Sequence, residues 1–207
     1  MKRPVFILLF ICVINQVDGQ FDEKNAIYGA NEINLGGYAG VDVSLNYIYN
    51  EKYSFRFGFS DNTRLSRSKP SDYSPGIIGI LTLGASTPRD YFRSFQLGCG
   101  RTVMLSETGK VRANLSVGIG FVKTKIPYNW QKIDGYLTDN YTWDYKTGHS
   151  ISLIINPKFE FPFTRYWGLS ISPMVQFYDG GTFFVVGVGH IFGLLRGTTP
   201  PARSSTE

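Results

Sequence analysis

Residues 151–161 read ISLIINPKFEF, and the side chains alternate between apolar and mostly polar with a period of two. Residues 111–121, VRANLSVGIGF, repeat this alternation with small or polar residues at the even positions. Successive side chains of a strand point to opposite faces of a sheet, so each stretch predicts a strand with one apolar face. A helix over the first stretch is excluded because Pro157 would break it and because the apolar spacing is two.

The same alternation recurs along the chain and predicts eight strands in all. They are expected at about 35–49, 53–60, 76–85, 91–105, 111–125, 151–161, 167–177 and 184–192. The strand at 76–85 has the weakest pattern, because its isoleucines do not alternate cleanly. The fold class that follows is all-β: a single eight-stranded antiparallel up-and-down transmembrane β-barrel over residues 34–195.

Alternation alone leaves open which face of the barrel points outward. In a soluble exported lipocalin-like barrel the apolar face would line a ligand cavity, whereas in a membrane barrel it meets lipid. The polar positions here are dominated by Ser, Asn, Gln and Gly, which suit a narrow interior better than a water-facing exterior. Aromatic residues near strand ends also favour the membrane, as girdles do in such barrels; they are Tyr47, Tyr49, Tyr53, Tyr166 and Trp167.

A few long charged residues share the inward parity. Because both signs are present, we expect them to pair as a charge network inside the lumen. They are Asp42, Arg56, Arg112, Lys158 and Glu160. Eight strands leave an interior that side chains fill, so open conduction is not expected.

The N-terminal residues predict export. Lys2 and Arg3 precede an apolar run over 5–14 and a plausible cleavage site at 17–19, a pattern typical of a secretory signal. The expected division is a signal peptide (1–19), an N-terminal segment (20–33), the barrel (34–195) and a disordered tail (196–207). The expected location is the outer membrane of a Gram-negative cell.

Net charge +5 and a pI near 9.1 raise the possibility of nucleic-acid binding, but the basic residues are scattered and the chain is exported. No nucleic acid is therefore expected as a partner. The acidic residues of 126–148 do not have the spacing of an EF-hand loop, and we expect no metal and no cofactor.

Two stretches are similar to a known family. Residues 44–59, SLNYIYNEKYSFRFGF, resemble the opening hairpin of small outer-membrane β-barrel proteins of Bacteroidetes-type bacteria, and residues 157–173, PKFEFPFTRYWGLSISP, resemble their closing strands. The resemblance implies an eight-stranded barrel of OmpA/OmpX-like architecture, and most such proteins have no assigned activity. The chain departs from the pattern after Phe192, where a polar tail follows instead of a terminal aromatic residue.

The long connection 126–148 is the candidate contact surface. Its aromatic and acidic side chains are of the kind that bind sugars or partner proteins, although aromatics also pack by default at a barrel rim or lipid interface. The candidate residues are Tyr128, Trp130, Asp134, Tyr136, Tyr141, Trp143 and Tyr145. The expected partners are outer-membrane lipid, lipopolysaccharide, and a surface protein or glycan. Arg64, Arg67 and Lys69 could meet lipopolysaccharide phosphates if their loop faced outward, but the strand count predicts a periplasmic loop.

An enzyme would have to recruit His149 with Ser150 or Ser152 and Asp144. Alternation puts His149 and Ser150 on opposite faces, and no nucleophile-elbow motif is present. We therefore expect no catalysis and a structural or cell-surface interaction role.

Overall fold

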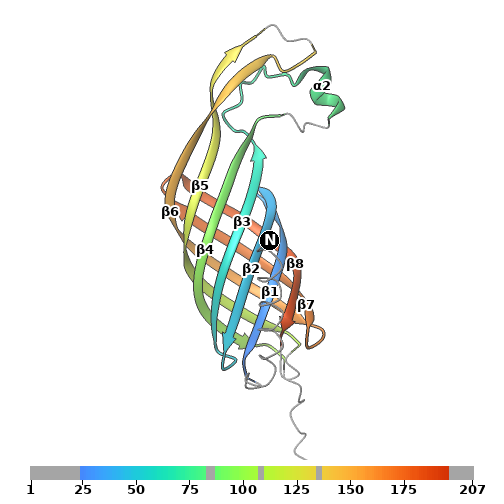
Figure 1. The fold of residues 1–207 in the computed structure, drawn as a ribbon, viewed down its shortest axis with the longest axis vertical. Helices are drawn as coiled ribbons and strands as arrows, with labels where there is room; N and C mark the ends of the chain where they lie inside the picture. The colour runs from blue at the N-terminus through green and yellow to red at the C-terminus, as the bar shows by residue number, and fades with distance from the viewer. Residues whose placement is uncertain (1–23, 83–86, 107–109, 134–136, 196–207) are drawn as a thin grey trace, which may run out of the picture.

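The computed structural model describes residues 24–82, 87–106, 110–133 and 137–195. The predicted signal peptide and tail lie outside these ranges. The elements are β1 (Ala26–Gly36), β2 (Ala39–Tyr49), β3 (Tyr53–Leu65), α2 (Gly76–Leu81), β4 (Arg89–Met104), β5 (Arg112–Lys132), β6 (Tyr141–Pro162), β7 (Trp167–Tyr178) and β8 (Gly181–Leu194). Each strand pairs antiparallel with the next and β8 pairs with β1, so the sheet closes on itself (Figure 1). The predicted eight-stranded up-and-down barrel is confirmed.

Two elements differ from the prediction, and the differences offset each other in the strand count. β1 lies in the segment that the sequence analysis left outside the barrel, because Tyr28 faces inward and Asn31 outward and so weaken its alternation. The stretch predicted as a strand over 76–85 instead forms the helix α2 over 76–81. Its isoleucines do not alternate, and Gly76 begins the helix with a positive φ of 61° after Pro75.

Because β1 was not among the predicted strands, the β3–β4 connection lies at the opposite end of the barrel from the predicted one. The β3–β4 connection (66–88) lies beside the tip of the β5–β6 hairpin, where Asn140 N donates to Ser74 O at 3.1 Å. Lys24 and Leu195 lie at the opposite end, hydrogen-bonded to Glu51 and Arg165 in the short turns there. The strand count predicts this connection at the same periplasmic end as the first and last residues of the barrel, and that prediction is wrong, since Lys24 and Leu195 lie at the other end.

Most of the connection predicted as a long loop over 126–148 belongs to strands. β5 and β6 continue past the other strands as a two-stranded ribbon, and only 133–140 joins them (Figure 1). A register shift between Tyr128 and Gln131 bends the ribbon, and Asn129 has a φ of 54° there. The ribbon and the described residues of the 66–88 connection (66–82, 87 and 88) together form what we call the lobe.

The two faces of the barrel wall have the polarity of a membrane barrel. Apolar side chains that alternate toward the outside are half exposed, as for Leu115 (58%), Phe55 (51%) and Leu153 (55%). Their neighbours Ser116 and Arg56 turn inward and are buried. A soluble barrel that holds an apolar ligand would have the opposite arrangement.

Pro157 and Pro173 lie opposite each other on β6 and β7. The ladder is paired at Ile155–Val175 and again at Phe159–Ile171, and no pair is formed between these two points. Each proline lacks a backbone donor, so placing both in one gap confines the loss to a single interruption of the sheet. Asn156 occupies the gap, where its Nδ2 donates to Pro173 O at 2.8 Å.

Candidate functional site: the barrel interior and the lobe

Three ion pairs lie in the middle of the barrel interior. Arg56 Nη2 is 2.6 Å from Asp42 Oδ1, and Arg112 pairs with Glu160 through its Nε. Lys158 Nζ is 2.9 Å from Glu32 Oε1. All of these side chains are buried. The structure thus brings the five predicted lumen residues inside the barrel, together with Glu32, which the prediction lacked because it lies on β1.

Neutral polar side chains complete this charged layer. Tyr28 donates to Glu160 Oε1 at 2.5 Å, and Ser170 donates to Glu32 Oε1 at 2.7 Å. Three acids (Glu32, Asp42, Glu160) face three bases (Arg56, Arg112, Lys158), so the formal charges of the layer cancel. Buried charges are tolerated when they are paired and hydrogen-bonded in this way.

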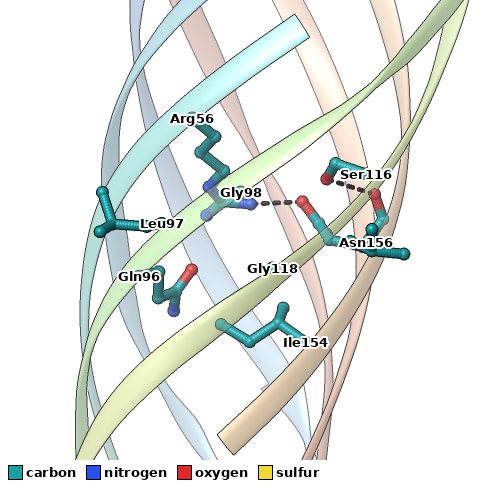
Figure 2. A pocket seen from close by; sticks show the side chains of 9 residues that line it. Arg56, Gln96, Leu97, Gly98, Ser116, Gly118, Ile154 and Asn156 are labelled. Atoms are coloured by element: carbon teal, nitrogen blue, oxygen red, sulfur yellow. Dashed lines mark hydrogen bonds between the residues drawn. The ribbon is translucent and has the colours of Figure 1, made fainter.

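The space left in the charged layer is small. A cavity of about 10 Å³ is lined by Arg56, Gln96 and Asn156 among others (Figure 2). That volume is about the smallest that can hold one water molecule. In Figure 2, Arg56 reaches across the cavity to the side-chain oxygen of Asn156.

Apolar clusters close the interior on both sides of the charged layer. Toward the lobe, the rings of Phe92 and Phe183 stack at 4.1 Å, and Tyr38 contacts Phe183 at 5.1 Å. At the opposite end, near Lys24, Tyr28 and Leu195 belong to a second buried cluster. The cluster near the lobe consists of Tyr38, Phe92, Val122, Ile154, Met174, Phe183 and Val185. Alternation does not predict these plugs, because their residues interrupt an otherwise small or polar face.

The lobe holds three of the seven predicted contact residues, Trp130, Tyr141 and Trp143, in one aromatic cluster. Trp130 and Trp143 lie 5.5 Å apart, and Tyr73 from the 66–88 connection contacts both rings at 6.2 and 6.3 Å. Tyr141 contacts Trp130 at 6.3 Å. Tyr73 is the residue of this cluster that sequence reasoning did not include.

The other predicted contact residues lie elsewhere. Tyr145 contacts Tyr91 at 6.1 Å, nearer the barrel wall. Tyr128 is exposed on the ribbon. Asp134 and Tyr136 lie outside the described residues. The aromatics therefore pack mainly against one another and against the 66–88 connection.

Hydrogen bonds hold the 66–88 connection to the ribbon. Asp72 accepts from Lys132 Nζ and from Tyr141 Oη, both at 2.7 Å, and these bonds lower the pKa of Asp72, the Lys132 bond most. Tyr73 donates to Asp139. Burial raises the pKa of Tyr73, and the bond to Asp139 raises it further. The polar contacts thus join segments about 60 residues apart in sequence into one body.

The tip of the lobe exposes apolar side chains. On α2, Ile80 and Leu81 are exposed, and Leu137 from the hairpin tip is exposed beside them, since its carbonyl accepts from Ile78 N. An open hollow of about 330 Å³ lies next to this tip and is lined by Ile133, Thr138, Asp139, Tyr141, Thr142 and Trp143.

The residues weighed for catalysis face different ways. His149 lies on the outer face opposite Lys123, whereas Ser152 is buried in the lumen and contacts Gln176 Oε1 at 3.2 Å. Asp144 accepts from Asn129. Within the described residues, no group of three or more His, Cys, Asp or Glu side chains could hold a metal ion. The described helix is too short to cross a bilayer.

Known proteins offer only distant likenesses. No protein-family model and no curated protein match the chain. Among solved structures, Ail of Yersinia pestis in complex with the heparin analogue sucrose octasulfate is 14% identical with a TM-score of 0.41, covering 81% of this chain and 95% of its own. Neisserial surface protein A is 10% identical with a TM-score of 0.46, over 82% and 95%. The N-terminal β-barrel domain of Pseudomonas aeruginosa OprF is 10% identical with a TM-score of 0.46, over 82% and 96%.

Proposed function

We propose that the chain is an outer-membrane β-barrel protein of the cell envelope, with a structural or cell-surface interaction role and no catalysis. The observation that carries the proposal is the polarity of the closed barrel, which is the inverse of that of a water-soluble barrel. Apolar side chains suited to lipid cover the outside, and paired charges lie inside. A water-soluble barrel with this exterior would expose an apolar band around its whole circumference, which would drive aggregation. In a bilayer the same band is the favourable arrangement.

The dimensions of the apolar band fit a membrane. Outward-facing apolar residues run from Ala113 to Phe121 on β5, a stretch that matches the roughly 9–11 residues of a tilted strand that crosses a bilayer. At the end of Lys24 and Leu195, Tyr49, Tyr53 and Trp167 are exposed on the outer face. Aromatic residues at this level are typical of the girdle at a lipid–water interface.

The proposed orientation follows from the connections. Those at the end of Lys24 and Leu195 are short, whereas the 66–88 connection and the projecting ribbon lie at the other end. Outer-membrane barrels have short periplasmic turns and longer extracellular loops. The termini are therefore proposed to lie in the periplasm and the lobe outside the cell.

The lobe is the proposed contact surface for a protein or glycan partner. Its aromatic cluster and hydrogen bonds give it a fixed shape, and its tip exposes Ile80, Leu81 and Leu137. The lumen is the less suitable site, because ion pairs and an apolar cluster fill it and the cavity beside Arg56 holds about one water. The Bacteroidetes-type resemblance of 44–59 and 157–173 is part of this proposal.

Two experiments test the proposal. Purified protein in detergent should migrate differently on a gel before and after boiling, because a folded barrel resists the detergent. On intact cells, trypsin added from outside should cut after Arg67, which is exposed in the lobe. Recovery in the soluble periplasm, with no shift on boiling, would contradict the membrane assignment. A lipid deacylase activity lost in His149→Ala would contradict the absence of catalysis.

A further inference from the structure

We propose that the outer wall of β4 and β5, just above the apolar band, is a binding site for the phosphate groups of lipopolysaccharide, through Arg93, Lys123 and Lys125. This inference rests on the proposed outer-membrane function and names the lipid that the barrel binds and where. It takes the place of the loop residues Arg64, Arg67 and Lys69, which the sequence offers for this role only if their loop faces outward.

The site begins where the apolar band ends. Phe59, Phe95, Phe121 and Ile151 lie side by side on β3 to β6 and form the last apolar row toward the lobe. Two residues farther along each strand, the next outward row consists of Asp61, Arg93, Lys123 and His149. If the band spans the hydrocarbon, this row lies at the level of the outer-leaflet headgroups.

The basic residues of the site are direct neighbours. Arg93 pairs with Lys123 in the register of β4 and β5, and directly opposite side chains on paired strands have Cβ atoms about 5 Å apart. Like charges in such positions repel each other and destabilise the sheet. A bound phosphate would turn this unfavourable pair into two favourable contacts.

Lys125 extends the site by one outward position. Its Nζ lies 4.3 Å from the centre of the Tyr145 ring and 5.9 Å from that of Tyr91. The two rings hold the ammonium group on the outer face without neutralising it.

The site carries more positive than negative charge. Asp61 is the acid of the row, and its Oδ2 is 2.5 Å from Arg93 Nη2. Neither Lys123 nor Lys125 has a carboxylate within ion-pair distance among the residues that the structure describes. With three cations against one anion, the site complements a doubly charged phosphate.

The basic residues occupy one side of the barrel. The described outward positions of β1, β2, β7 and β8 carry no Lys or Arg. At the corresponding edge of the band these strands present apolar residues, such as Leu35, Val41 and Phe184. A general preference for basic residues at the interface would surround the barrel, so the one-sided cluster favours a discrete lipid site.

The loop residues are less suitable for this role. Arg64 pairs with Asp90 at 2.9 Å and covers the Tyr38 ring at 4.4 Å, so it closes the top of the lumen. Lys69 lies over the Tyr73 ring at 5.1 Å, within the lobe.

The test uses the full-length protein in nanodiscs of zwitterionic lipid, titrated with bis-phosphorylated lipid A. Lys123→Gln/Lys125→Gln should bind about 30-fold more weakly than the unmodified protein, since each lysine near a charged headgroup contributes about a fivefold factor. The matched control, Lys52→Gln/Arg101→Gln, removes the same charge at the opposite end of the barrel, where Arg101 faces outward next to Tyr53. The control should bind normally, and dephosphorylated lipid A should bind the unmodified protein and the double variant equally weakly.

Three outcomes would overturn the site. They are equal binding of phosphorylated lipid A by the unmodified protein and Lys123→Gln/Lys125→Gln, an equal loss in the control, and equal affinity for phosphorylated and dephosphorylated lipid. In each case a barrel that inserts and shifts on boiling would leave the proposed function intact. Failure of the unmodified protein to insert would overturn both proposals.

Discussion

Glu32 and Lys158 form an ion pair of 2.9 Å across the barrel interior, although their strands β1 and β6 are not neighbours in the sheet. Both side chains are buried, and Ser170 donates a further hydrogen bond to Glu32 at 2.7 Å. The pair links opposite walls of the barrel. It therefore contributes to filling the lumen as well as to neutralising its charges.

Breaking this pair should destabilise the barrel. Glu32→Gln and Lys158→Met should each cost about 3–5 kcal/mol of unfolding free energy, because each leaves an uncompensated buried charge. The double variant should lose less than the sum of the two, since neither charge is then left alone. Urea unfolding in lipid vesicles, followed by tryptophan fluorescence, measures all three values. Strictly additive losses would contradict the pairing.

The aromatic plug predicts that loss of a ring lowers stability more on the inner face of β4 than on its outer face. Phe92→Ala should cost about 3–5 kcal/mol of stability, because it leaves a cavity where the ring stacks on Phe183. Phe95→Ala, three residues along on the outer face, should cost clearly less, because lipid chains can fill the vacated space. Both variants are measured in the same vesicles. A larger loss for Phe95→Ala would mean that the assigned inner and outer faces are exchanged.

Removing a ring from the aromatic cluster should loosen the lobe and leave the barrel folded. Trp143→Ala removes the ring that contacts both Trp130 and Tyr73, so the 66–88 connection should open and be cut faster by protease. The barrel should still resist detergent in unboiled samples, because Trp143 lies on β6 where β5 and β6 continue past the other strands (Figure 1). Tyr128→Ala is the control, since this exposed residue lies outside the cluster. Loss of the folded band in Trp143→Ala would show that lobe and barrel fold as one unit.

Acid should weaken the attachment of the lobe. The pKa of Asp72 is lowered by its hydrogen bonds from Lys132 and then Tyr141, so the carboxylate is stabilised in the folded lobe. A lowered pKa contributes stability that is full above the ordinary value and is lost as the pH falls through the lowered one. An NMR titration should give a lower midpoint for Asp72 in the unmodified protein than for Asp72 in Lys132→Met. Equal midpoints in the two proteins would contradict the contact.

Alternation alone was enough to predict the barrel, because the pattern depends only on which side of the wall a side chain faces. It also grouped Asp42, Arg56, Arg112, Lys158 and Glu160 on one face, and the structure brings them inside. β1 was missed since Asn31 faces outward and Tyr28 inward, against the pattern. Missing β1 also concealed Glu32, the partner of Lys158.

The features that depend on long-range contact could not be predicted in the same way. Phe92 and Phe183 are inward-facing aromatics on separate strands, and only closure of the barrel stacks them. Likewise, Tyr73 joins Trp130 and Trp143 because the β3–β4 connection folds against the ribbon. The basic site depends on the register of β4 and β5, which places Arg93 opposite Lys123. The sequence of either strand alone does not indicate this pairing.

The membrane assignment can be tested with a native reporter. Cys99 faces outward in the apolar band and pairs in register with Phe55 and Val117. In a Cys12→Ala protein it is the only cysteine. A spin label on Cys99 in lipid vesicles should be relaxed strongly by oxygen and weakly by a water-soluble nickel complex. A label that is reached by the nickel complex and shielded from oxygen would contradict a lipid-facing outer wall.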